Sequence, residues 1–133
     1  YDAGMPPRRR TDPDVGRAAL AAWQVDPEGV DRAALGTAVR YTLEELGARA
    51  PGRSVEVRVP PFGAVQCLDG PRHTRGTPPN VVEADAETWL RLATGDQGWA
   101  EALAQGRLRV SGTRADLDAL LPLTEPETTR AAR

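Results

Sequence analysis

The segment from residue 81 to residue 123 constrains the fold more than any other part of the chain. Short elements follow one another there, with a start or stop signal at nearly every junction. Gly95, Gly106 and Gly112 stand where apolar-patterned segments end, and glycine is the residue that most readily ends a helix. The segment reads strand, helix, short helix, strand and helix. This order predicts a fold that mixes helices with strands.

Capping signals give the expected elements of this segment. Asp85 precedes one helix and Asp96 a shorter one. Thr113 and Asp116 have the spacing of a capping box, which predicts a last helix that Pro122 ends. The expected elements are a strand at 81–84, helices ending at Gly95 and Gly106, a strand containing Leu108 and Val110, and a helix with the face Leu117, Leu120 and Leu121.

Two helices are expected in the N-terminal half. Thr11 and Asp14 also have capping-box spacing, so a first helix should run to about Trp23, with Val15, Ala19, Ala22 and Trp23 on one face. Asp31 should cap a longer helix that ends near Ala50. Its apolar positions recur at helical spacing and form a stripe for packing on a sheet, namely Leu35, Ala38, Val39, Thr42, Leu43, Leu46 and Ala50.

Strand signals follow the long helix. Three valines alternate with charged residues in 54–59, which indicates a strand with one buried face. Pro60 and Pro61 interrupt it, and a second strand is expected from Phe62 to Leu68. Residues 69–79 form an irregular loop that is long for a compact domain, which indicates a functional or mobile segment. Segregated helices and strands predict an α+β fold, one sheet covered by helices.

Composition predicts a single soluble domain. The 133 residues suit one domain at 11–123, with tails at 1–10 and 124–133, and Met5 reads as a start residue after an expression remnant. The net charge is −2 and the basic residues, all arginines, are scattered, so neither nucleic acid nor an anionic membrane is an expected partner. A single cysteine and the lack of a long apolar run favour the cytoplasm and no membrane insertion.

The chain offers few groups for catalysis. Cys67, Asp69 and His73 are the set that most suggests a nucleophile and a base, but their spacing matches no mechanism. Strand alternation places Cys67 in the core if Val65 faces inward. One cysteine and one histidine cannot build a zinc site, and no phosphate-binding or dinucleotide motif occurs. We therefore expect no enzyme activity, no metal and no cofactor.

The C-terminal segment resembles the sterol carrier protein family, in particular an actinobacterial-type branch of it. The residues that carry the resemblance are Val81, Val82, Glu83, Asp85, Leu92, Thr94, Gly95, Trp99, Leu103, Gly106 to Val110, Gly112 and Leu117. A looser agreement in element order reaches back to Asp31. The resemblance implies a mixed or antiparallel sheet of about five strands with helices over it. Four strands are strong in the sequence, and part of the long loop is a candidate for the fifth.

The resemblance also implies a hydrophobic tunnel between sheet and helices for an apolar ligand. The residues expected to line it are Phe62, Trp89, Leu92, Trp99, Leu103, Leu108, Leu117 and Leu120. Large aromatic residues on an inward face also suit an ordinary core. In the long loop, Arg75 and His73 are candidates to hold an anionic head group, with a solvated basic loop as the alternative.

Three functions follow. The first is a small cytosolic carrier of a lipid or fatty-acyl-type ligand. The second is an interaction or accessory domain whose cavity is filled by side chains. The third is an enzyme or a domain that accompanies one. Relatives that bind lipids line the tunnel with several Phe and Met, whereas this chain has one of each, which favours the second function over the first. The oligomeric state stays open.

Overall fold

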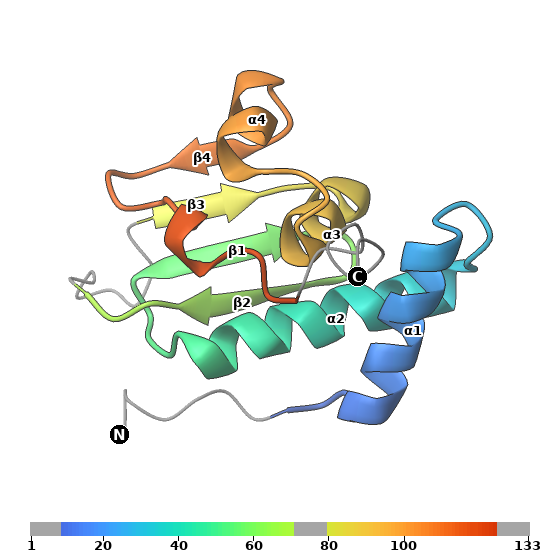
Figure 1. The fold of residues 1–133 in the computed structure, drawn as a ribbon. Helices are drawn as coiled ribbons and strands as arrows, with labels where there is room; N and C mark the ends of the chain where they lie inside the picture. The colour runs from blue at the N-terminus through green and yellow to red at the C-terminus, as the bar shows by residue number, and fades with distance from the viewer. Residues whose placement is uncertain (1–8, 71–79, 125–133) are drawn as a thin grey trace, which may run out of the picture.

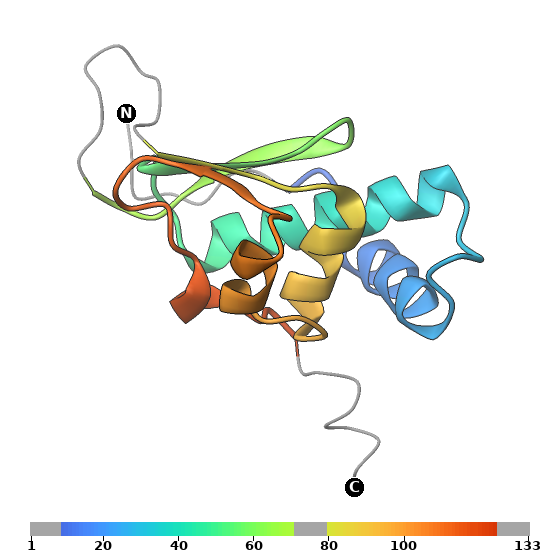
Figure 2. The ribbon, with the colours of Figure 1, turned by 90° about the horizontal axis from the view of Figure 1, so that it is seen from above.

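The protein is described by a computed structural model that covers residues 9–70 and 80–124. One sheet is covered on one face by helices, as Figures 1 and 2 show. The elements, in chain order, are α1 (Pro13–Val25), α2 (Arg32–Arg49), β1 (Val55–Val59), β2 (Gly63–Cys67), β3 (Asn80–Glu83), α3 (Ala86–Thr94), α4 (Trp99–Ala104), β4 (Arg109–Ser111) and the 3-10 helix η1 (Asp118–Leu120).

The sheet is mixed and has the strand order β2-β1-β3-β4. β1 pairs with β2 and β3 with β4 in antiparallel fashion, whereas β1 and β3 are parallel. β3 lies on the opposite side of β1 from β2, so two strands that follow each other in sequence are not neighbours in the sheet. The α+β class and a mixed sheet are confirmed. The described residues contain four strands, one fewer than expected, and residues 71–79, the candidate for the fifth, lie outside them.

The long helix α2 forms where its apolar stripe and its cap predict it. Asp31 caps it by accepting a hydrogen bond from the backbone N–H of Ala34 at 2.8 Å. Its inward residues share one core with the three valines of β1, all of which are fully buried. The stripe and the alternating valines are therefore the two faces of one hydrophobic core, as expected. No helix in the described part of the chain has the length and apolar character needed to span a bilayer.

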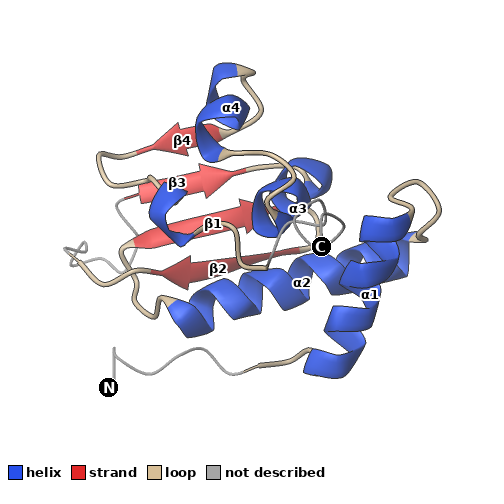
Figure 3. Ribbon diagram, in the orientation of Figure 1, coloured by secondary structure: helices blue, strands red, loops and turns tan. Residues whose placement is uncertain are grey.

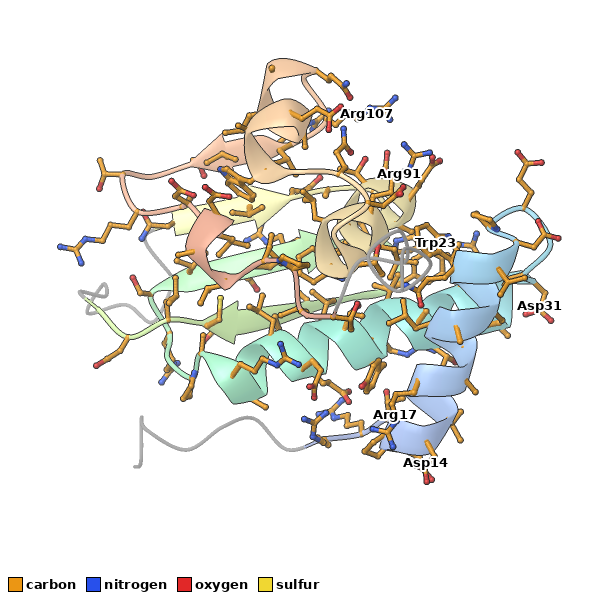
Figure 4. The ribbon with its side chains drawn as sticks, viewed as in Figure 1. Asp14, Arg17, Trp23, Asp31, Arg91 and Arg107 are labelled. Atoms are coloured by element: carbon orange, nitrogen blue, oxygen red, sulfur yellow. The ribbon has the colours of Figure 1, made fainter. Side chains whose placement is uncertain are left out.

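Helix α1 packs on α2, and its inward face differs from the one expected. The buried residues are Gly16, Leu20 and Trp23. Of the four residues expected on this face, Trp23 is buried and Ala19 partly buried, whereas Val15 and Ala22 are exposed. Gly16 sets this rotation because a Cβ there would lie 2.4 Å from Cγ of Tyr41 on α2. The cap is Asp12, not Thr11, because Thr11 turns to Glu44 of α2. Figure 4 shows Trp23 on the side of α1 that faces α3.

The C-terminal segment agrees with its expected caps at α3 and departs from them afterwards. Asp85 caps α3, and Gly95 ends it in the left-handed conformation at φ 83°. The cap of α4 is Gly98 and not Asp96. The expected last helix is only the short η1, drawn after β4 in Figure 3, although the side chain of Asp116 accepts a hydrogen bond from the N–H of Asp118.

Candidate functional site

The residues expected to line a tunnel lie mostly in a closed core. Trp89 is 1% exposed, and Leu92, Trp99, Leu108 and Leu117 are buried beside it in the same cluster. Leu120 and Phe62 are partly buried against that cluster. Leu103 is different, since 42% of it is exposed. This exposure contradicts an inward role: α4 buries Trp99 and Ala102, and Leu103 lies at the margin of that buried face.

Trp89 is also held by a hydrogen bond inside this core. Its Nε1–H donates to Oγ1 of Thr42 at 2.8 Å, and that hydroxyl donates in turn to backbone carbonyls of α2. The bond ties α3 to α2 through the middle of the core. A ligand at this place would have to break it and displace fully packed side chains.

Outside this core, a hollow of about 580 Å³ lies between helix α2 and the edge strand β2. One wall comes from α2, the opposite one from β2, and the segment before α1 reaches one side. The residues around it are Arg10, Arg40, Leu43, Glu44, Phe62, Gly63, Ala64, Val65 and Gln66. We call it the α2–β2 groove.

The groove runs along the outer edge of β2 and not over one face of the sheet. Side chains of a strand alternate between the two faces. Four consecutive residues, 63–66, all line the groove, so it must follow the strand edge where both faces and the backbone are accessible. Within residues 9–70 and 80–124, β2 is the last strand on its side of the sheet, and Figure 1 shows α2 running beside it. The groove therefore offers both side chains and strand backbone to a ligand.

Apolar and basic groups meet at one end of the groove. The bare backbone of Gly36 makes room for them, because a Cβ there would lie 3.0 Å from Nη1 of Arg40 and 3.0 Å from Cδ1 of Phe62. The guanidinium of Arg32 lies 5.1 Å from the centre of the Phe62 ring, within cation–π range. The buried side chain of Leu43 adds apolar surface. This end can receive a hydrocarbon beside a positive charge.

The segment before α1 is fixed to α2, which places Arg10 at the groove. Glu44 accepts hydrogen bonds from N and Oγ1 of Thr11 at 3.0 and 3.4 Å. Glu45 pairs with Arg9 and, at 3.2 Å, with Arg49. Burial works to raise the pKa of Glu45, but the bonds and charges of these two arginines outweigh it, so its pKa lies below the usual value. Both carboxylates are thus engaged by other groups.

The other candidate site residues named from the sequence lie partly inside and partly outside the residues that the structure describes. His73 and Arg75 lie outside the described residues. Within those residues, no three His, Cys, Asp or Glu side chains come together as a metal site. Cys67 is fully buried, as expected from strand alternation, and burial raises the pKa of its thiol to about 12. A thiol this far from ionising is a poor nucleophile.

The raised pKa of Cys67 predicts a loss of stability at alkaline pH. In the unfolded chain the thiol ionises near its usual value of 9.0, whereas in the folded protein it stays protonated up to about 12. Its contribution is therefore complete below pH 9 and decreases as the pH rises toward 12, by about 1.4 kcal/mol per pH unit. Urea melts at several pH values should show this extra slope in the wild type and not in Cys67→Ala. Parallel curves for the two proteins would contradict it.

Two smaller hollows lie away from the groove. One, of about 100 Å³, lies between α1 and α3 and is lined in part by Trp23, Gln24 and Arg91. Figure 4 labels Trp23 and Arg91 there. Arg91 is already paired with Glu87 at 3.0 Å. The other, of about 270 Å³, lies at the end of the sheet, and most of the residues around it are charged. The α2–β2 groove is therefore the better candidate for an apolar ligand.

Sequence reasoning missed Arg10, Arg40 and the edge of β2 as site residues. Arg40 follows Arg32 and Gly36 at four-residue spacing on α2, which is a visible signal for one shared helix face. The sequence has no comparable signal for the edge position of β2, because the order of strands in a sheet is set by tertiary pairing and not by the residues of one strand.

Comparison with known proteins agrees with the fold. The model of a protein family described as bacterial SCP ortholog, where SCP stands for sterol carrier protein, matches residues 31–123. The match starts at the cap of α2 and ends just after η1, so it includes both walls of the groove but not α1. No curated protein matches the chain.

Proposed function

The chain belongs to the family of bacterial sterol carrier protein orthologs, and from this we propose that it is a non-catalytic carrier of an apolar, fatty-acyl-type ligand. The proposal includes a cytoplasmic location, which fits a single buried cysteine. It also includes the absence of a nucleic-acid partner, which fits the net charge of −2.

The observation that carries the proposal is the α2–β2 groove. It offers about 580 Å³ between the sheet and a helix, within the usual range for small-molecule sites. Phe62 and Ala64 offer apolar surface to a hydrocarbon chain, and Leu43 and Val65, which also line the groove, are almost fully buried. Arg40 and Arg10 stand beside that surface and suit a carboxylate or another anionic end. Of the residues expected to line a tunnel, Phe62 is the one that lines this groove.

A position deeper between the layers has less support. Trp89, Leu92, Trp99 and Leu117 would have to separate to admit a chain, and close-packed interiors resist such opening. A head-group role for Arg75 and His73 stays a prediction for a part of the chain outside the described residues. Arg40 is the better-supported head-group residue, because its surroundings are known.

Arg40→Gln tests the proposal. We expect it to weaken dodecanoate binding by about 1.5–3 kcal/mol, the range for hydrogen bonds to charged groups, and to leave dodecanol binding unchanged. Isothermal titration calorimetry of both ligands measures this. Arg58→Gln is the matched control, since the exposed Arg58 lies on β1, away from the groove, and pairs with Glu56 at 2.8 Å. Equal loss for both ligands, or no binding of either to the wild type, would count against the proposed site.

The second candidate is an interaction domain without a lipid ligand, which the closed core favours. Native mass spectrometry of protein purified without detergent separates the two candidates. A co-purified adduct of lipid size supports the carrier. A bare chain, together with no dodecanoate binding, supports the interaction domain.

A further inference from the structure

The two edges of the sheet are protected to very different degrees. β4, at one edge, has three residues and begins with Arg109, closely preceded by Arg107. Short length and charge are the usual means of preventing an edge strand from pairing with another chain. β2, at the other edge, has the sequence Gly-Ala-Val-Gln-Cys, without a charge or a proline. An edge of this kind is open to an added strand.

The shape around β2 fits an extended chain. β2 uses one edge to pair with β1, and no other strand in residues 9–70 and 80–124 pairs with it. The α2–β2 groove follows its outer edge past residues 63–66. The backbone N–H and C=O groups of β2 that point away from β1 lie along this groove. A peptide backbone would pair with them, as in other cases of strand addition.

The positive charge of the α2–β2 groove indicates which kind of chain would bind there. Arg10 and Arg40 line the groove, and neither forms an ion pair within the described residues. Among the described residues that line the groove, Glu44 has the one carboxylate, and it accepts hydrogen bonds from Thr11. Pairing of β2 with β2 of a second copy about a two-fold axis would bring these arginines toward their own equivalents. The groove therefore favours an acidic chain over a second copy.

We propose that the outer edge of β2 binds an extended, acidic peptide segment of a partner protein as an added strand. Every second side chain of that segment is apolar and faces Leu43 and Phe62. An acidic side chain pairs with Arg40. The peptide shares the groove with the proposed apolar ligand but does not require it, so carrier function and peptide binding can fail separately.

The test uses a blocked heptapeptide in which Val alternates with Glu, added to ¹⁵N-labelled, ligand-free protein. We expect saturable amide shifts along β2 and at Arg40, and none along β4. The same peptide with Lys in place of Glu, or with all its amides methylated, should bind at least about tenfold more weakly, a difference of about 1.4 kcal/mol. Arg40→Glu should reverse the preference between the Glu and Lys peptides, whereas Arg109→Glu, on the other edge, should leave it unchanged.

Several results would overturn the proposal. Equal binding of the Glu and Lys peptides would remove the charge argument, and undiminished binding of the methylated peptide would remove strand pairing. Absence of shifts at millimolar peptide would remove both. A dimer that forms through β2 as protein concentration rises, seen by light scattering, would make a second copy the occupant. Dodecanoate that binds while the peptide does not would refute this inference and leave the carrier proposal standing.

Discussion

Gly52→Ala is expected to destabilise the protein by about 3 kcal/mol or more. A Cβ at Gly52 would lie 2.1 Å from the backbone C and O atoms of Leu68 and 2.4 Å from N of Asp69. These are backbone atoms that cannot turn away, and the φ angle of 150° is one that alanine rarely adopts. Overpacking and backbone strain each cost about 1–3 kcal/mol, so their sum is large for a small domain.

Backbone hydrogen bonds on both sides of Gly52 tie this segment to Leu68, so the two backbones cannot easily move apart to admit a Cβ. The N–H of Leu68 donates to the carbonyl of Ala50 at 2.7 Å, and the N–H of Ser54 donates to the carbonyl of Leu68 at 2.9 Å. Urea denaturation measures the loss. Gly98→Ala is the matched control, because a Cβ at Gly98 meets nothing within 4 Å, and it should change stability by less than about 1 kcal/mol. Similar stabilities for the two variants would show that the backbone around Gly52 can move to admit a Cβ.

Trp89→Ala is expected to cost about 3–5 kcal/mol, the range for removing a large aromatic residue from a packed core. Trp89 is fully enclosed between α3, α2 and the sheet and bonds to Thr42 at 2.8 Å. Trp89→Phe keeps much of the volume and should cost less. If Trp89 instead walled an open tunnel, truncation would remove few contacts, and a loss below about 1.5 kcal/mol in urea melts would indicate this.

The sequence was most informative where a local signal and the tertiary fold agree. The caps at Asp31 and Asp85 and the end of α3 at Gly95 were all predicted, because each depends on one residue and its immediate neighbours. The stripe of α2 and the valines of β1 were predicted because strong periodicity shows which face is buried. Membership of the family and the α+β class are confirmed as well.

Predictions failed where contacts distant in sequence decide the local structure. The helix expected after Thr113 is reduced to η1, because the backbone N–H of Arg114 donates to the side chain of Asn80 on β3 at 2.9 Å and holds the chain against the sheet. Val15 was expected inside, but the close approach of Gly16 to α2 turns it outward. Leu103 is 42% exposed because α4 turns Trp99 and Ala102 toward the core, which leaves Leu103 at the margin of the buried face.

The candidate site could be predicted only in part. Phe62 was named as a ligand-lining residue, and it does line the α2–β2 groove. The partners that make the groove distinctive, Arg10 and Arg40, come from two other segments and meet Phe62 only in the folded chain. These residues come together only because β2 is an edge strand. β2 holds that position because β3 pairs with the other side of β1.

Amide mapping with an apolar ligand decides whether the ligand site is the α2–β2 groove or the core under α3 and α4. Dodecanoate is titrated into ¹⁵N-labelled protein, and the shifts are placed on the sequence. We predict the largest shifts along residues 63–66, with Arg40 beside them. Largest shifts at Leu92, Trp99 and Leu117, with the β2 edge unchanged, would contradict the groove as the ligand site.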